Sequence, residues 1–363
     1  MNQEKRYTIA FSLIDAIGPR AFGRIRAFFP TLQEAWDAPR QEYIRAGIGE
    51  KTTDYILEAK KNVSIDSCLA SLVQENISVV TLDDGQYPAL LNQISDPPFI
   101  LYYQGAFPKN SDILFGIVGA RKASPYGIQT THVLVRGIAS KQIGIVSGLA
   151  YGIDAAAHEA TLAVNGYTIG VLAGGIDRAS IYPRTHKHLA ERIVASGGCV
   201  LSEYPPSTQP IKRNFPLRNR IIAGISKGIV VIEAALGSGA LITATCALEQ
   251  NREVCAVPGP IFSPLSAGTN HLIKSGAHVV TDASDILAVL GYDVENLEKQ
   301  AADLSHLSED EKKIFFVIEQ EPLHIDELIS RSQLDTALVM STLLMLEMKN
   351  LIRSHDRMQY SRV

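Results

Sequence analysis

Residues 113–127, ILFGIVGARKASPYG, contain the pattern that decides the fold. The apolar, β-branched run at 113–118 predicts a buried strand, and Gly119 follows it directly. Ser124 and Pro125 are typical of an N-cap and a first helical position. Because the free amides of that helix start and Arg121 converge on one spot, this strand-to-helix turn predicts an anion site.

The same alternation of strand and helix recurs further along the chain. Apolar strands are predicted at 113–118, 143–146, 168–172, 199–201, 228–232, 254–257 and 277–280. Helical patterns, such as those at 128–141 and 240–250, separate them. Uninterrupted apolar strands that alternate with helices indicate a mostly parallel sheet covered on both faces. The sequence therefore predicts an extended Rossmann-like α/β domain over residues 86–292.

Two smaller modules are expected to flank this domain. Residues 1–85 indicate short helices with two helix-hairpin-helix-type turns, near Gly18 and at 46–51, which predicts an all-helical, helix-hairpin-helix or SAM-like domain. The glycines there fit either phosphate-facing amides or, as we favour, helix C-caps. Residues 293–304 are polar and predict a linker. Residues 305–363 predict three helices and a hairpin, the order of a winged-helix domain.

Charge is distributed unevenly along the chain. The net charge is −4, but residues 184–220 carry seven Lys/Arg and two acids, which leaves −9 for the rest. A local basic patch on an acidic protein favours one defined polyanion site. Within it, residues 212–220, KRNFPLRNR, combine cations, amides and a ring. This combination is typical of sites for single-stranded nucleic acid.

Three more glycine-rich turns follow apolar strands, at 146–154, 173–177 and 233–243. Carboxyl ends of parallel strands meet at one sheet edge, so these turns predict a shared phosphate-binding groove. No G-x-G-x-x-G with its downstream acid and no P-loop lysine is present, which disfavours an NAD or ATP site. We expect no bound cofactor.

Seven motifs in order resemble the signature series of the DNA-processing protein A family (DprA, also called Smf). They are GAR at 119–121, SGLAYGID at 147–154, YP at 182–183, SEYPP at 202–206, FPLRNRIIAG at 215–224, SGALITA at 238–244 and VPG at 257–259. The resemblance covers roughly residues 80–290. It implies a sequence-independent single-stranded DNA-binding protein that protects incoming DNA and loads the RecA recombinase in natural transformation. It also implies a homodimer formed through the central domain.

The resemblance also implies roles for individual residues. Arg121, Lys212 and either Arg218 or Arg220 would bind phosphates, Arg184 would add charge at the rim, and Phe215 would stack on a base. The expected DNA-binding residues are Gly119, Arg121, Ser147, Gly148, Arg184, Lys212, Phe215, Arg218, Asn219, Arg220, Gly237 and Ser238.

Three of these assignments keep alternatives. Arg218 and Arg220 point about 200° apart on a helix, so one is expected to bind DNA and the other to pair with Glu203 or Glu233. Phe215 is either a stacking ring or a core residue. Asn219 either contacts a base or caps a turn.

We expect no enzymatic activity. Asp154 and His158 are spaced to pair within one helix, and no G-x-S-x-G elbow accompanies them. The alternative is a phosphoribohydrolase-like, Rossmann-type hydrolase, because Glu233 precedes the glycines at 237–239; the Pro-Gly-Gly-x-Gly-Thr run of those enzymes is absent. No metal is expected, since His186 and His188 lack ligand spacing. The four cysteines are interpreted as small buried hydrophobes.

The remaining expectations concern location and partners. No apolar run approaches the roughly 20 residues of a membrane helix, and no signal-type segment opens the chain, which predicts a cytoplasmic protein. The expected recognition helix, 335–347, contains no Lys or Arg, so we expect the winged helix to bind another protein or to self-associate. Residues 272–274 and 286–290 are candidates for the dimer surface.

Overall fold

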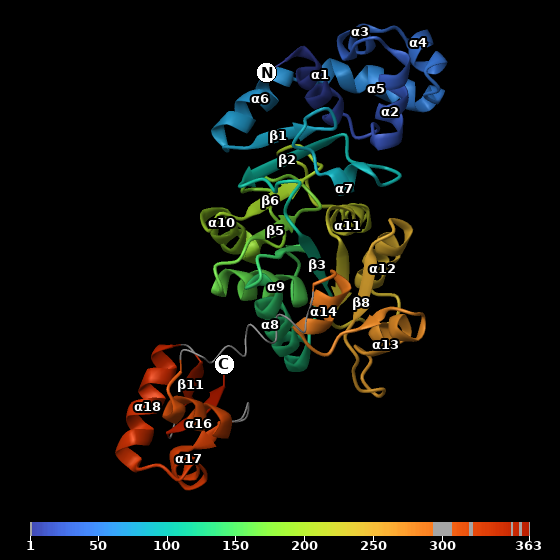
Figure 1. The fold of residues 1–363 in the computed structure, drawn as a ribbon. Coiled ribbons are helices and arrows are strands. Elements are labelled where there is room, and N and C mark those ends of the chain that lie inside the picture. Colours follow the sequence, from blue (N-terminus) through green and yellow to red (C-terminus); the bar gives the residue numbers. More distant parts are fainter. Residues whose placement is uncertain (1, 293–306, 319–321, 350, 356–357, 363) are drawn as a thin grey trace. The chain divides into compact units, whose positions relative to one another are not determined.

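A computed structural model describes residues 2–292, 307–318, 322–349, 351–355 and 358–362 (Figure 1). The predicted linker at 293–304 lies outside these residues. The chain divides into two compact units, Met1–Tyr292 and Asp293–Val363, which are described separately below. No helix in the described part of the chain is long and apolar enough to span a membrane.

A nine-stranded sheet organises the first unit. Seven strands run parallel in the order β6-β5-β4-β3-β7-β8-β9. They are β3 Leu114–Val118, β4 Gly144–Ser147, β5 Thr168–Val171, β6 Cys199–Ser202, β7 Gly228–Val231, β8 Glu253–Ala256 and β9 His278–Val279. The predicted mostly parallel sheet is thereby confirmed. The chain winds outward from β3 in one direction and then, from β7, in the other, so β3 and β7 flank the switch point where open α/β sheets bind ligands.

Two antiparallel strands extend the sheet beyond β6. β2, Ile100–Gly105, pairs with β6, and β1, Ser78–Thr81, pairs with β2. The expectation that residues up to 85 are helical is therefore wrong for β1. A four-residue strand whose first residue is exposed and last two are buried gives little periodic signal, which explains why the sequence did not reveal it.

Helices cover both faces of the sheet. α8 packs on α9, α9 on α10 and α14 on α8, while α11 and α12 pack on each other on the opposite face (Figure 1). The bounds are α8 Pro125–Ala139, α9 Ile153–Ala163, α10 Lys187–Ala195, α11 Asn214–Ile225, α12 Gly239–Glu249 and α14 Ala283–Val289. Short helices α7 Ala89–Asn92, η1 Arg184–His186 and α13 Ala267–Lys274 complete this part. Ser124 caps α8, accepting a hydrogen bond from the Gly127 amide at 3.1 Å, as the sequence predicted.

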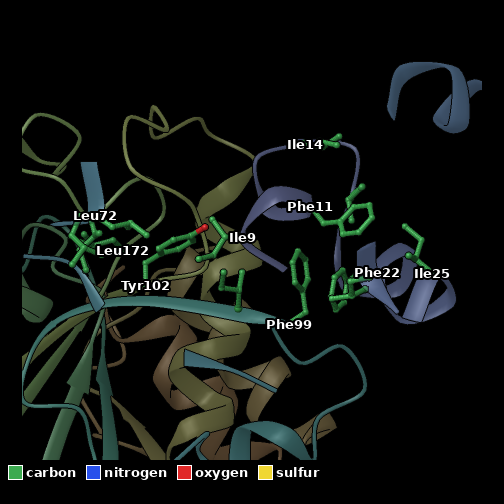
Figure 2. Packing of buried hydrophobic residues seen from close by; sticks show 14 of the residues in the cluster. Ile9, Phe11, Ile14, Phe22, Ile25, Leu72, Phe99, Tyr102 and Leu172 are labelled. Carbon is green, nitrogen blue, oxygen red and sulfur yellow. The ribbon is translucent and has the colours of Figure 1, made fainter. Parts of the chain in front are cut away.

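Six helices precede the sheet and share a hydrophobic core with it. They are α1 Gln3–Ser12, α2 Pro19–Phe28, α3 Leu32–Asp37, α4 Arg40–Arg45, α5 Glu50–Asn62 and α6 Ile65–Gln74. Phe22 of α2 stacks on Phe99, beside β2, with ring centroids 4.0 Å apart (Figure 2). The Ser12 and Tyr102 hydroxyls lie 2.6 Å apart, which adds a polar link between α1 and β2.

The hairpin glycines of these helices act as helix caps. Gly47 follows α4 with φ +80°, the left-handed conformation that ends many helices, and its amide bonds to the Ile44 carbonyl. Gly18 and Gly49 are the N-caps of α2 and α5. Gly47 therefore fits the favoured C-cap interpretation, whereas Gly18 and Gly49 lie at helix starts instead.

The second unit has winged-helix architecture, as predicted. α16 Glu309–Val317, α17 Ile325–Ser332 and α18 Thr336–Met348 are followed by the hairpin β11 Ile352–His355 and β12 Gln359–Arg362. β10, Leu323–His324, pairs with β12 and was not predicted, because two residues carry no periodic pattern. The helices and hairpin enclose their own hydrophobic core, centred on Leu328, Leu343 and Leu346.

Candidate nucleic-acid interface

A groove of about 720 Å³ lies at the switch point of the sheet. The turn after β3 forms one wall, and the first turns of α11 and α12 form the other. Some of the residues expected from the sequence to bind DNA line this groove: Gly119, Arg121, Lys212, Phe215, Arg218, Asn219 and Ser238. The turns after β3 and β7 thus meet at one edge of the sheet, as the chain order required.

An aromatic and cationic cluster marks the middle of this groove. The Arg121 guanidinium lies over the Phe215 ring, 5.0 Å from its centroid. Tyr182 meets the same ring edge-on at 5.9 Å. Phe215 is half-buried, and Tyr182 is 48% exposed. Because Phe215 lines the groove instead of lying in the sheet's core, its geometry fits a stacking ring better than a core residue.

Positive potential in the groove has two sources. Arg121, Lys122 and Lys212 are exposed lining residues. The N-terminus of α12 has neither a side-chain cap bond nor an acid in the first turn, so it adds partial positive charge. The start of α11 also lacks an acid but offers fewer donors, because the Asn214 amide bonds to the Ile211 carbonyl and Pro216 has no amide hydrogen. The Ser238 hydroxyl, at the α12 N-cap, has no hydrogen-bond partner among the described residues.

Arg218 forms the floor of the groove. It is 4% exposed and donates from Nη1 to the Gly148 carbonyl at 2.6 Å and to the Val171 carbonyl. Burial lowers the pKa of Arg218 to about 10, so the side chain stays charged near neutral pH. Burial raises the pKa of the nearby Asp154 carboxyl, against the opposing effect of the Arg218 charge. Arg218 thus supplies fixed charge from below and is held by backbone carbonyls.

Gly148 is required by this floor. A Cβ atom at this position would lie 2.5 Å from Arg218 Nη2 and 2.7 Å from Asp154 Oδ2. Gly119 is similarly constrained, since its Cβ would lie 2.6 Å from Ile153 of α9. Both glycines permit close packing under the groove. Gly237, another glycine expected at the site, has φ +76° and allows the chain to turn into α12.

Arg220 is the arginine that pairs within the protein. It donates to Glu203 at 2.7 Å and to Asp96 at 3.3 Å, and its side chain is 8% exposed. Burial raises the pKa of the Glu203 carboxyl, which the Arg220 charge partly offsets. Since Arg220 is absent from the described groove lining, a phosphate contact for it is not supported.

Two further expected contacts are engaged in internal bonds. The Ser147 hydroxyl is buried and donates to the Ile117 carbonyl at 2.6 Å, so it cannot reach a ligand. Asn219 donates to the Gly239 carbonyl at 3.1 Å and accepts from Arg218 Nε at 3.2 Å. Asn219 therefore ties α11 to α12 and orients Arg218. Arg184 is exposed at the start of η1, outside the described groove lining.

The residues that suggested catalysis have structural partners. Glu233 accepts hydrogen bonds from the Ser124 amide at 2.9 Å and from the Ser124 hydroxyl, so it fixes the start of α8. His158 Nδ1 lies 2.7 Å from the Thr168 hydroxyl, while Asp154 accepts from the Ala150 amide. The expected Asp154–His158 pair is therefore wrong, because each side chain turns to a different partner.

No metal-binding group emerges in the part of the chain that the structure describes. There, no three His, Cys, Asp or Glu side chains gather in a way that could hold a metal ion. Cys199 and Cys255 are fully buried, and Cys68 and Cys246 are half-buried. Burial raises the pKa of all four thiols.

Sequence reasoning left several groove residues out of the site. They include Lys122, Tyr182, Pro210, Ile242 and Thr243. Tyr182 belonged to a quoted motif, and an aromatic residue in the loop between two predicted strands was the available signal. Its contact with Phe215, 33 residues away, depends on the packing of the β5–α10 loop against α11 and leaves no pattern in the sequence.

Comparison with known proteins shows the family of this chain. The family described as DNA recombination-mediator protein A matches residues 78–291, and the DprA winged helix domain matches residues 298–356. The chain belongs to the DNA recombination-mediator protein A family. Within this family, Protein Smf of Synechocystis sp. is 34% identical over 99% of both chains. Protein Smf of Escherichia coli is 40% identical over 76% of this chain and 74% of its own.

Solved structures of the family resemble this chain. DNA processing protein A from Streptococcus pneumoniae is 34% identical and superposes with a TM-score of 0.67, over 79% of this chain and 98% of its own. The Helicobacter pylori protein, whose structure concerns its single-stranded DNA binding mode, is 30% identical with a TM-score of 0.51. That match covers 59% of this chain and 95% of the Helicobacter protein. The family resemblance read from the seven motifs is thereby confirmed.

Proposed function

We propose that this chain binds single-stranded DNA without sequence preference, protects it, and delivers it to the RecA recombinase during natural transformation in the cytoplasm. The observation that carries the proposal is the groove in which Arg121 and Tyr182 contact the half-buried Phe215 ring beside exposed Lys212. Cations and helix N-termini suit phosphates, and an accessible ring suits the face of any base.

The same geometry favours a single strand over a duplex. A ring inside a groove can stack only on a base that has left its paired stack. The Asn219 amide and the Arg218 guanidinium are engaged in bonds within the protein, so neither is free to read base edges. Recognition through phosphates and base faces explains why no sequence preference is expected.

A gel shift with single- and double-stranded oligonucleotides tests this proposal. Arg121→Ala and Lys212→Ala should each weaken binding of the single strand several-fold, because each removes a phosphate contact. Lys141→Ala is the matched control, since Lys141 is exposed beyond the opposite end of α8 from the groove. Equal affinity for both strand forms, or equal loss in the control, would remove the proposal.

We infer that the groove has no catalytic role. The phosphoribohydrolase-like alternative depended on Glu233, and that carboxylate is held by Ser124 at the start of α8. An assay for free base released from nucleoside monophosphates distinguishes the two functions. We expect no release. Turnover that Glu233→Gln abolishes would establish the hydrolase instead.

We also propose that the chain forms a homodimer. Of the two candidate surfaces, 286–290 is mostly internal, because Ile286 and Leu287 of α14 are buried, while Val289 and Leu290 are half-buried and Ala288 is exposed. Residues 272–274 in α13 are partly exposed, and the neighbouring β9 is an edge strand. Light scattering should give twice the chain mass.

RecA loading is tested by adding the protein to RecA and single-stranded DNA, where faster filament assembly is expected.

The second unit is proposed to contact protein. Its α18 contains no Lys or Arg, and its outward side exposes apolar side chains. These are Leu338, Met340, Leu344, Met345 and Met348. A helix that reads a DNA groove needs cationic or forked donors, which α18 lacks. Binding of duplex DNA by residues 305–363 at physiological salt would contradict this role.

A further inference from the structure

An apolar tip projects from the loop that follows β8. Residues 257–266 read VPGPIFSPLS, and at the tip Ile261 is 82% exposed and Phe262 is 92% exposed. Among the large apolar side chains of the described residues, Phe262 is the most exposed. Full exposure of two adjacent large apolar residues has no stabilising role in the folded chain, so it indicates a contact with another molecule.

The loop is held firmly at both ends. Gly259 and Asn270 exchange two hydrogen bonds, at 3.2 and 3.0 Å, and the Tyr126 hydroxyl donates to the Pro258 carbonyl at 3.0 Å. A turn bond from the Ser263 amide to the Pro260 carbonyl closes the tip. The Phe262 ring is therefore presented by an ordered backbone, which lowers the entropic cost of using it in binding.

The loop lies beside the candidate groove. β8 is parallel to β7, so the loop leaves the sheet at the same edge as the turn before α12. Leu265 lines the groove, and its carbonyl accepts from the Ala234 amide at 2.7 Å. Three residues of extended chain reach at most about 11 Å, so Phe262 lies within that distance of the groove wall.

The electrostatic surroundings admit a polyanion at this tip. Neither residues 234–248 nor residues 254–281 contain an Asp or Glu, and Lys274 is the one lysine or arginine among them. Leu236, 66% exposed in the turn before α12, adds apolar surface at the same edge of the sheet. A strand leaving the groove past the first turns of α12 would thus meet apolar groups, because the one acid of α12, Glu249, lies at the opposite end of that helix.

We propose that Phe262 is a second base-stacking platform, which takes the first unpaired bases that emerge from the groove at its α12 end. The proposal rests on the single-stranded DNA function proposed above. Every base has an aromatic face, so one exposed ring accepts any of them. The contact involves no charge, and it lengthens the bound stretch of strand without changing the number of phosphate contacts.

Oligonucleotide length tests the proposal. Phe262→Ala should weaken binding of a strand of about 12 nucleotides by about 5- to 150-fold, the range for losing one stacked base. Binding of a strand of about 4 nucleotides, sufficient for one small site, should not change. Phe316→Ala is the matched control, because Phe316 is an exposed ring in the other unit. The salt dependence should be the same for Phe262→Ala and the unaltered protein.

A fluorescent variant tests the stacking directly. Phe262→Trp adds a tryptophan to a chain whose natural one, Trp36, lies among the N-terminal helices. Long oligonucleotides should quench it, and abasic sites in the emerging segment should remove the quenching. The proposal would be overturned if Phe262→Ala bound both the long and the short strand as tightly as the unaltered protein does. A change in the molar mass of that variant would also overturn it. Failure of the unaltered protein to bind any single strand would instead overturn the proposed function.

Discussion

Arg218 and Arg220 differ by two positions in one helix and face different surroundings. Arg218 projects under the groove, where backbone carbonyls hold it, and Arg220 projects toward Glu203 and Asp96. Helical spacing alone predicted that their roles would separate. It did not predict which arginine pairs with an acid, because Glu203 lies in the segment after β6 and approaches α11 only in the folded chain.

Removing the Arg121 guanidinium should change the salt dependence of single-strand binding. Each phosphate contact contributes about −0.7 to the slope of log K against log salt for single strands. Arg121→Ala should therefore flatten the slope by roughly that amount in a fluorescence anisotropy titration. Arg121→Lys keeps the charge and should restore the slope, while the lost planar contact with Phe215 leaves affinity lower. An unchanged slope in Arg121→Ala would contradict a phosphate contact.

His158 should make the protein less stable in acid. Burial lowers its pKa to about 3, below its ordinary value of 6.5. Between these two values the unfolded chain binds the extra proton, so stability falls as the pH falls from 6.5 toward 3. At pH 5 the loss is on the order of 2 kcal/mol.

Urea denaturation at pH 7 and pH 5 measures this loss. His158→Gln removes the titrating ring and should show a smaller difference between the two pH values than the unaltered protein. Other buried groups, such as Asp154 and Glu203, titrate in both proteins and so cancel in the comparison. Identical pH dependence in the two proteins would show that His158 is not responsible.

At the scale of elements, the start of α8 depends on a glycine. A Cβ at Gly127 would lie 2.3 Å from Glu233 Oε2, the oxygen that accepts from the Ser124 amide. Gly→Ala inside a helix ordinarily stabilises by about 0.5–1 kcal/mol. Gly127→Ala should instead destabilise, because the new methyl group displaces the Glu233 carboxylate that holds Ser124, the N-cap of the helix.

A glycine in another helix supplies the matched control. Gly23 lies within α2, is exposed, and has open space where its Cβ would be. Thermal unfolding should show a higher midpoint for Gly23→Ala and a lower one for Gly127→Ala. If both variants are stabilised, Glu233 moves without cost and does not fix the start of α8.

Elements were predictable where their pattern was long and uniform. All seven parallel strands were found to within one or two residues, because most of them are buried on both faces and give short, uninterrupted apolar runs; β9, whose two residues are exposed, was found from the apolar run at 277–280. β1, β2 and β10 were not predicted, because all three pair antiparallel and lie outside the alternation of strands and helices from which the sheet was predicted. Lys212 was predicted from charge density and Arg121 from the turn after β3, whereas the internal bonds of Ser147 and Asn219 depend on tertiary packing.

At the scale of the whole molecule, the two units differ in net charge. Residues 1–292 carry +2 and residues 293–363 carry −6. Because the groove lies in the first unit, a chain that ends at Tyr292 should keep its affinity for single-stranded DNA. At low salt the affinity should rise slightly, since the acidic part is gone. Fluorescence anisotropy at two salt concentrations measures this, and a large loss at both would assign part of the binding to the second unit.

The stacked pair Phe22 and Phe99 has a consequence for how the molecule melts. The N-terminal helices and the sheet bury their side chains in one cluster, so neither can lose its packing without exposing the other. Calorimetry should therefore resolve two cooperative transitions, one for residues 1–292 and one for the winged helix, although the sequence contains three modules. A shortened chain that begins after α6 would expose the Phe99 and Tyr102 side of the sheet to water and aggregate.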